Sequence, residues 1–141
     1  MDLRIVDGEA DLWKALIVRG IVFVEEQRVP YDGEVDAHEA TAIHVLGEEA
    51  GEPVAVGRLR RTDDGWGKLE RIAVRPAWRG RGFGREVVRF LLDEAEKRGW
   101  RRLMMHAQVH LEDFYREFGF EPRGEIFVEC GIDHLLMVRE G

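Results

Sequence analysis

The chain has 141 residues, 45% of them hydrophobic, which fits a single packed domain spanning 1–141. Its longest aliphatic stretches, 15–18 and 21–24, are far too short to span a bilayer, so we exclude a membrane protein. The formal net charge of −7 argues against nonspecific binding to nucleic acid or to a membrane surface.

The first half of the chain predicts one helix among short strands. Residues 3–6 read as a strand, and a helix follows from Glu9. Residues 29–33 break that helix into a loop that runs to about His38. Segments 42–47, 54–60 and 69–74 are separated by turn residues and predict an antiparallel meander. One face of the helix is predicted to hold apolar residues at three- and four-residue spacing: Leu12, Trp13, Leu16, Ile17, Gly20 and Val24.

The second half predicts two helices and three strands. A glycine-rich loop precedes an amphipathic helix that begins near Phe83 and ends with two cations and Gly99. Segment 103–107 reads as a strand and 110–118 as a short helix stopped at Gly119, while 120–128 and 134–138 read as closing strands. This mixture predicts an α/β or α+β sheet with helices packed on it.

An anion-binding turn is predicted between residues 75 and 89. A strand feeds a loop containing Gly80, Gly82 and Gly84, and the loop opens directly into a helix. Glycine permits close backbone approach, and the first amides of a helix have no intrahelical partner, so they can donate to an anion. The segment also has a local charge of +4, from Glu86 against five arginines: Arg75, Arg79, Arg81, Arg85 and Arg89. These features predict a phosphate cradle.

Two common phosphate-binding motifs do not fit this turn. A P-loop needs Lys-Ser or Lys-Thr after its last glycine, and Arg85-Glu86 stands there. A dinucleotide fingerprint starting at Gly80 needs glycine or alanine at position 85 and an acid after the next strand, where Gln108 stands. A tight turn beside solvated arginines remains an alternative.

Two segments carry a family resemblance. The sequence Arg-Gly-Arg-Gly-Phe-Gly at 79–84 resembles the Arg/Gln-x-x-Gly-x-Gly/Ala signature of the GNAT superfamily of acyl-CoA-dependent N-acyltransferases. Segment 114–120 resembles the family's Phe-Tyr-x-x-x-Gly-Phe, and 23–30 and 124–134 resemble the ElaA-like branch. The resemblance implies a mixed, mostly antiparallel twisted sheet of about seven strands, with helices on both faces and strands four and five splayed at the cofactor site.

The resemblance also implies acetyl-CoA as cosubstrate and no metal. The amides of Ile72, Ala73 and Val74 would bind the pantetheine arm and a developing oxyanion. Gln108 stands where many family members carry an asparagine that contacts this arm. The remaining cofactor-binding residues implied are Arg79, Gly80, Arg81, Gly82, Phe83, Gly84, Arg85 and Phe114.

Acyl transfer to an amine requires a base, because alkylamines with a pKa near ~10.4 are mostly protonated at neutral pH. Glu70 is the candidate, acting directly or through water, and it fits the family's usual base on this strand. Strand alternation predicts Glu70 on one face with Ile72 and Val74. The alternative is a surface glutamate paired with Arg71 or Arg58.

The departing coenzyme thiolate requires an acid. The resemblance implies that Tyr115 is this general acid. A phenol of pKa about 10 can give its proton to a thiolate whose thiol has a pKa of about 8.5, if the two groups are in contact. Phe114 and Phe118 share one helical face and Tyr115 is turned away from it, which supports this role. The alternative is a core aromatic residue.

The acceptor site is less defined by sequence. Segment 25–39 holds six acids and one base, so it could attract a cationic amine or be a solvated loop. Glu26 and His44 are candidate acceptor contacts. An EF-hand starting at Asp32 is excluded by register, and the five histidines are expected to be hydrogen-bonded rather than metal ligands. Cys130 is the single cysteine of the chain, which excludes an internal disulfide. No histidine or cation is placed by the sequence to lower the pKa of its thiol.

The sequence therefore predicts a cytoplasmic N-acetyltransferase that moves an acetyl group from acetyl-CoA to a primary amine in a ternary complex. The acceptor would be a small-molecule amine or a peptide amine, and a homodimer is possible. The alternative is a noncatalytic acyl-CoA-binding sensor. Binding to nucleic acid through Arg-Gly-Arg-Gly is opposed by the net charge.

Overall fold

A single sheet of seven strands, in the order β1-β2-β3-β4-β5-β7-β6, organises the computed structural model, which describes residues 1–141. The strands are β1 (Asp2–Ile5), β2 (Ile43–Glu49), β3 (Glu52–Arg61), β4 (Gly67–Val74), β5 (Leu103–Gln108), β6 (Glu121–Glu129) and β7 (Ile132–Arg139). The helices are α1 (Gly8–Arg19), α2 (Tyr31–Glu34), α3 (Phe83–Lys97) and α4 (Glu112–Arg116), with a π-helix η1 (Gly20–Glu26) and 3₁₀ turns η2 (Pro76–Trp78) and η3 (Val109–Leu111). None of these helices is both long and apolar enough to cross a membrane.

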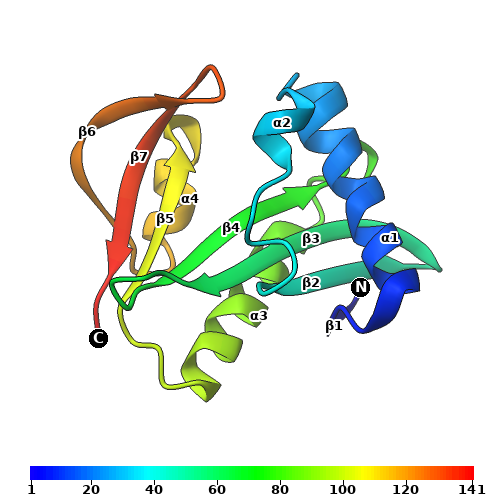
Figure 1. Ribbon diagram of the computed structural model, residues 1–141, viewed down its shortest axis with the longest axis horizontal. Helices are drawn as coiled ribbons and strands as arrows, with labels where there is room; N and C mark the ends of the chain where they lie inside the picture. The colour runs from blue at the N-terminus through cyan, green and yellow to red at the C-terminus, as the bar shows by residue number, and fades with distance from the viewer.

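The sheet opens between its fourth and fifth strands. Every neighbouring pair is antiparallel except β4 and β5, which are parallel. These two pair only at Gly67 with Leu103 and Lys68 with Met104, and then diverge (Figure 1). The predicted splay is confirmed, and it leaves the backbone groups along the rest of this edge of β4 without a strand partner.

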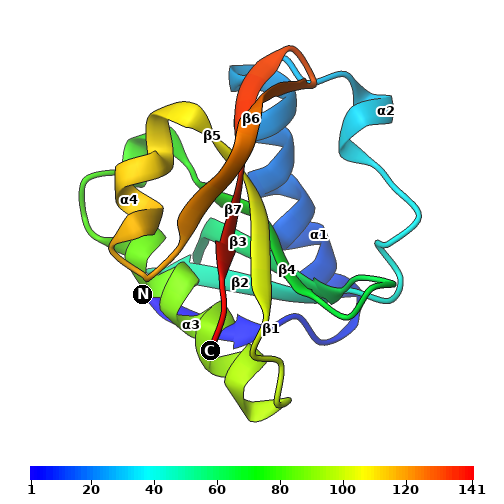
Figure 2. The ribbon, with the colours of Figure 1, turned by 90° about the vertical axis from the view of Figure 1, so that its left-hand side faces the viewer.

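Helices cover both faces of the sheet, as predicted. Figure 2 shows α1 and α2 on one side of the strands and α3 and α4 on the other. The larger hydrophobic core lies under α3 and includes Val87, Leu91 and Tyr115. A smaller core lies under α1 and includes Val18 and Leu46. Burying an apolar stripe of each helix against the sheet stabilises this arrangement.

The side of α1 that packs on the sheet is not the apolar face predicted from the sequence. The predicted stripe lies on the helix surface, with Trp13 61% and Ile17 53% exposed. The buried positions are instead Ala15, Val18 and Arg19. From Gly20 the chain continues as the π-helix η1, whose wider turn ends the 3.6-residue periodicity on which the prediction rested. Arg19 is buried here because carboxylates on α2 and beyond it pair with its guanidinium.

Two predicted segments differ in detail. The loop predicted over 29–38 contains the one-turn helix α2. The helix predicted over 110–118 is divided into the 3₁₀ turn η3 and the short helix α4. Both differences concern single turns, which short-range sequence patterns define poorly.

A bulge in β4 reverses which face its residues occupy. Arg71 has a φ of 56°, and the register with β3 shifts between Val56 and Arg58. Ile72 consequently packs on the core under α3, whereas Glu70 lies beside Arg58 on the face covered by α1. The prediction that strand alternation puts Glu70, Ile72 and Val74 on one face is therefore wrong, because the extra residue interrupts the alternation.

Candidate active site

Two cavities meet at the opening between β4 and β5. The larger, of about 750 Å³, lies beside the glycine-rich loop at the start of α3. The smaller, of about 470 Å³, lies between β4, β5, α2 and the β6–β7 hairpin. Six residues line both: Gln27, Ile72, Gln108, Leu111, Tyr115 and Ile132. The two cavities therefore adjoin along these six residues.

The larger cavity gathers the predicted cofactor residues. All of them line it except Arg81, whose guanidinium stacks 4.9 Å from the centre of the Trp78 ring. Gln108, the departure from the family pattern, lines the cavity and donates a 3.0 Å hydrogen bond to Gln27. The structure therefore brings together residues that stand 36 positions apart in the sequence, from Ile72 to Gln108.

Two glycines set the backbone of the predicted phosphate cradle. Gly80 and Gly82 both have a φ of 80°, a left-handed conformation that other residues adopt only with strain. Gly82 is the N-cap of α3 and no side chain caps the helix, so its first-turn amides remain free to donate. The dipole of this 15-residue helix adds positive potential at the same point.

The arginines contribute less free charge than the sequence count indicates. Arg79 forms a two-pronged ion pair with Glu26, at 2.6 and 2.7 Å, and donates to the Val74 carbonyl at 2.9 Å. Arg85 pairs with Glu117. Because these acids come from outside the 75–89 segment, the local charge of +4 is partly neutralised. The predicted anion site would then depend mainly on the backbone amides at the start of α3.

The change Gly82→Ala tests this assignment. A Cβ at position 82 would meet no protein atom within 4 Å, so its methyl would cost mainly the strain of the left-handed backbone. If the loop binds the diphosphate as predicted, the methyl would also intrude on that ligand. We expect the Kd for coenzyme A, measured by calorimetry, to rise at least ~10-fold, equivalent to about 1.4 kcal/mol.

Gly51→Ala is the matched control for that change. Gly51 has a φ of 81° and equally open surroundings, but it lies in the β2–β3 turn away from either cavity. It should lose similar stability and keep its affinity for coenzyme A. Equal affinities for all three proteins would show that the glycine loop does not bind the diphosphate.

Tyr115 stands in the wall between the cavities. It is 6% exposed, packs edge-on against Phe114 at 5.0 Å and Phe120 at 6.5 Å, and belongs to the larger core. Burial raises the pKa of its phenol to about 12. Tyr115 is therefore a core aromatic residue that also lines both cavities and keeps its proton at neutral pH.

Glu70 lines the smaller cavity within a group of cations. One carboxylate oxygen accepts a 2.6 Å hydrogen bond from Arg60 and lies 2.9 Å from Arg58, and Lys68 is 3.7 Å from the other. Burial disfavours the charge, but these three cations outweigh it and hold the pKa of Glu70 below its usual range. The pairing with Arg58 that the alternative named is present, although Glu70 is largely buried rather than at the surface, and Glu70 stays ionised.

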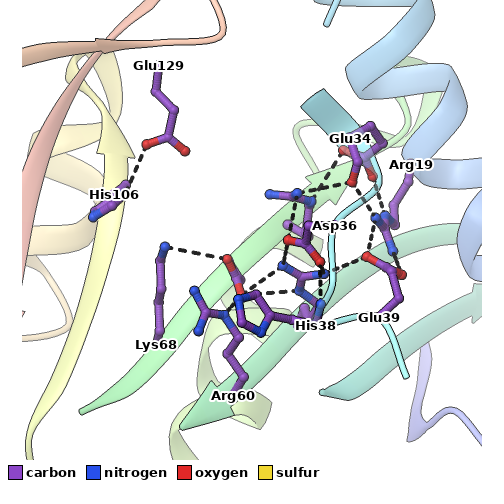
Figure 3. A network of polar contacts seen from close by, with 12 residues as sticks. Arg19, Glu34, Asp36, His38, Glu39, Arg60, Lys68, His106 and Glu129 are labelled. Carbon is purple, nitrogen blue, oxygen red and sulfur yellow. Dashed lines mark hydrogen bonds and ion pairs between the residues drawn. The ribbon is translucent and has the colours of Figure 1, made fainter. Parts of the chain in front are cut away.

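This cluster extends into a buried ion-pair network (Figure 3). Arg58, with no exposed surface, contacts Asp36, Glu39 and Glu70. The network comprises five cations, Arg19, Arg58, Arg60, Lys68 and Arg71, and four carboxylates, Glu34, Asp36, Glu39 and Glu70. Three of the six acids of the 25–39 segment, Glu34, Asp36 and Glu39, are thus already paired and not free to attract a cationic substrate, whereas Glu25 and Asp32 are exposed as in a solvated loop.

The two candidate acceptor contacts lie elsewhere. Glu26 lines the larger cavity and pairs with Arg79. His44 lines neither cavity, and its Nε2 is 2.8 Å from the Glu39 carbonyl. The structure therefore gives neither residue a place in the smaller cavity, because Glu26 is drawn to the glycine loop and His44 lies among the residues packed around the ion-pair network.

The smaller cavity also holds a histidine–glutamate pair that was not predicted from the sequence. His106 on β5 and Glu129 on β6 lie with Nδ1 and Oε2 2.9 Å apart, and this hydrogen bond lowers the pKa of Glu129. Twenty-three residues separate them, and β7 lies between their strands. Only the three-dimensional arrangement of the curved hairpin reveals this pair, so no local sequence pattern predicts it.

Comparison with known proteins identifies the family. The family described as "Acetyltransferase (GNAT) domain" matches residues 23–140. The uncharacterized N-acetyltransferase YjcF of Bacillus subtilis (strain 168) is 36% identical over 141 residues, covering 99% of this chain and 100% of the relative. The crystal structure of Escherichia coli ElaA superposes with a TM-score of 0.89 at 30% identity, covering 99% of both chains. An acyl-CoA N-acyltransferase from Pseudomonas aeruginosa gives a TM-score of 0.88 at 30% identity, covering 98% of both. With the splayed sheet and the glycine loop in place, these matches show that the chain belongs to the GNAT acetyltransferase family.

Proposed function

We propose that the protein is an N-acetyltransferase that moves the acetyl group of acetyl-CoA to a primary amine by direct attack in a ternary complex. Membership of the family supports acyl transfer from acyl-CoA. The single observation that carries the rest is the meeting of the two cavities at Tyr115. One cavity carries the anion-binding loop and the other carries ionisable groups, so donor and acceptor can be bound together.

Groups along the opening in the sheet would bind successive parts of acetyl-CoA. Acetyl-CoA supplies an acyl group activated as a thioester. The amides at 80–85 would hold its diphosphate, and the unpaired edge of β4 beyond Lys68 would hold the pantetheine arm. Amides in the stretch 72–74 would donate to the carbonyl oxygen as it gains negative charge during attack.

Tyr115 would give its proton to the sulfur as the carbon–sulfur bond breaks. Its pKa of about 12 exceeds the ordinary thiol value of about 8.5. Burial, however, raises the pKa of a thiol in the same place, since it disfavours both anions alike. The two groups therefore remain matched well enough for proton transfer in contact.

Glu70 would receive the proton of the amine through a water molecule in the smaller cavity. Its lowered pKa makes it a weak base, so Glu70→Gln should lower kcat/KM by about 10- to 100-fold at neutral pH. If Glu70 acts in this way, raising the pH toward the amine pKa of about 10.4 should recover much of the rate, because the free amine then forms without a base.

The control for Glu70→Gln is Glu140→Gln, at an exposed ion pair with Arg123. A purely structural role for Glu70 would instead give a loss of rate that is independent of pH and accompanied by a lower melting temperature. Steady-state kinetics over the pH range, with thermal melts of the same samples, separate these two cases.

The proposed function itself is tested by release of the coenzyme thiol from acetyl-CoA over a panel of polyamines, amino acids, aminoglycosides and peptide N-termini. We expect turnover with at least one class of amine and an acetylated product by mass spectrometry. Binding of acetyl-CoA without turnover across the whole panel would contradict the proposal and favour a noncatalytic sensor.

A further inference from the structure

One end of the smaller cavity carries two cations with unused hydrogen-bond donors. Arg60 on β3 lies directly opposite Lys68 on β4, and both line the cavity. Arg60 uses only Nε, on Glu70, and the closest carboxylate oxygen to Lys68 Nζ is 3.7 Å away on the same residue. Their side chains are only 17% and 12% exposed, so the cavity is the main route to these donors.

The positive charge at this end exceeds the negative charge. The buried network holds one more cation than it holds carboxylates, and its other arginines each contact at least two acids. Arg60 and Lys68 share Glu70 alone, and Glu70 also serves Arg58. The surplus charge therefore falls on Arg60 and Lys68, at the end of the network away from Arg19 and Glu34 (Figure 3).

The β6–β7 side of the cavity carries an acid, Glu129, whose pKa is lowered mainly by His106 and also by the charges of His134 and Lys68. Glu129 is paired only with His106 and faces Ile132 across the β6–β7 ladder. Ile132 lines both cavities, so Glu129 stands near the point where an amine would meet the thioester. The other ionisable groups lining the cavity do not reverse this polarity: Glu34 and Asp36 pair with Arg71, which also lines it, Asp32 is exposed, and the rest are His38, His134 and Cys130.

A length of β4 separates the two cations from the junction of the cavities at Ile72. Four residue steps lead from Lys68 to Ile72, or roughly 13 Å at about 3.3 Å per residue, and the long side chains of Lys68 and Arg60 shorten this gap. An α-amino acid is too short to bridge this gap, because its amino and carboxylate groups are bonded to the same carbon atom. A di- or tripeptide, at about 3.3–3.6 Å per residue, is of suitable length.

From this polarity and spacing we propose that the acceptor is an elongated amino-carboxylate, such as an ω-amino acid or a short peptide with free termini. Its anionic end is held by Arg60 and Lys68, and its amine lies toward Glu129 and Tyr115. This inference rests on the proposed acetyl transfer and names its substrate class. It replaces the cationic acceptor that the acidic 25–39 segment suggested.

A series of acceptors of equal length tests the inference. We expect kcat/KM for 6-aminohexanoate to exceed that for 6-aminohexanamide and for 1,6-diaminohexane by about 10- to 100-fold, because hydrogen bonds to charged groups are stronger than neutral ones. Triglycine should likewise exceed triglycinamide. Equal use of the carboxylate and the amide by the wild-type protein would overturn the inference even if acetyl transfer occurs.

Reversal of charge at Lys68 gives a sharper version of the test. Lys68→Glu should remove the preference for 6-aminohexanoate and shift it toward the diamine, and Lys68→Met should remove the preference without reversing it. Glu70 keeps Arg58 and Arg60 in both variants. Lys97→Glu, at a side chain 72% exposed on α3, makes the same change of charge remotely and should leave the preference intact.

A binding measurement distinguishes failure of this inference from failure of the proposed function. The probe is 6-acetamidohexanoate, which has the carboxylate and the acetylated nitrogen but no free amine, compared with its amide by calorimetry. Tighter binding of the carboxylate that Lys68→Glu abolishes supports the anion site even if no amine is acetylated. Turnover without any advantage of the carboxylate, in rate or in binding, overturns the inference and leaves the acetyltransferase proposal standing.

Discussion

Replacement of Tyr115 by phenylalanine is expected to lower kcat by about 10²- to 10⁴-fold while leaving the Kd for coenzyme A unchanged. The ring would remain packed against Phe114 and Phe120, so the core would lose no volume. Only the hydroxyl of this residue, which lines both cavities, would be lost. Single-turnover kinetics with acetyl-CoA, together with calorimetry of coenzyme A, measure the two quantities separately.

The second tyrosine of the chain provides the control. Tyr31 begins α2, is 72% exposed and lines neither cavity, so Tyr31→Phe should retain wild-type kcat. An unchanged kcat in Tyr115→Phe would remove the tyrosine from the reaction and restrict it to the core. A parallel loss of kcat and of coenzyme affinity would show instead that the hydroxyl helps to bind the cofactor.

Replacement of Arg58 by methionine is expected to cause the largest loss of stability. Arg58 is fully buried and pairs with Asp36, Glu39 and Glu70, and its loss would leave these carboxylates short of positive charge in the interior. Breaking a buried ion pair in this way costs about 3–5 kcal/mol, which corresponds to a fall in Tm of roughly 10–20 °C. Thermal and urea melts at neutral pH measure it.

Two comparisons make the Arg58 result specific. Arg123→Met removes an exposed pair with Glu140 and should cost less than about 1 kcal/mol. If both variants melted alike, the buried network would have no special role in stability. If Arg58→Met unfolded with the same Tm and the same cooperativity as the wild-type protein, the prediction would be contradicted directly.

The pH dependence of stability gives a second signature of the same change. Hydrogen bonds from Arg58 to Asp36 lower the pKa of that carboxyl, and the pKa values of Glu39 and Glu70 also lie below the usual range although burial opposes this. Stability from such groups is present above their unfolded pKa values, near 4, and is lost as the pH falls through the folded values. Wild-type protein should therefore lose more stability between about pH 6 and pH 3 than Arg58→Met.

Sequence patterns correctly predicted features that depend on interactions between residues close together in the chain. The glycine spacing after β4 requires left-handed backbone and an open helix start, and Gly80, Gly82 and α3 take these forms. Alternation and turn residues placed all seven strands within a few residues. The splay of β4 from β5 came from family resemblance, since no local pattern encodes it.

Features that depend on tertiary packing were not predictable in this way. The left-handed Arg71 inserts one residue into β4 and moves Glu70 to the opposite face, yet nothing in the local sequence marks a bulge. The apolar stripe on α1 defines one side of a helix but not which side meets the sheet. That choice depends on Arg19 finding Glu34 and Glu39, which lie 15 and 20 residues further along the chain.

The common wall of the two cavities has a consequence for inhibitor design. Because Ile72, Tyr115 and Ile132 border both spaces, the proposed sites of the nucleotide-bearing thiol and of its reaction partner adjoin each other along these three residues. A single compound that joins coenzyme A to an amino acid chain through a non-cleavable linker can fill both at once. Such a bisubstrate ligand loses translational freedom only once on binding, so it gains affinity that neither half has alone.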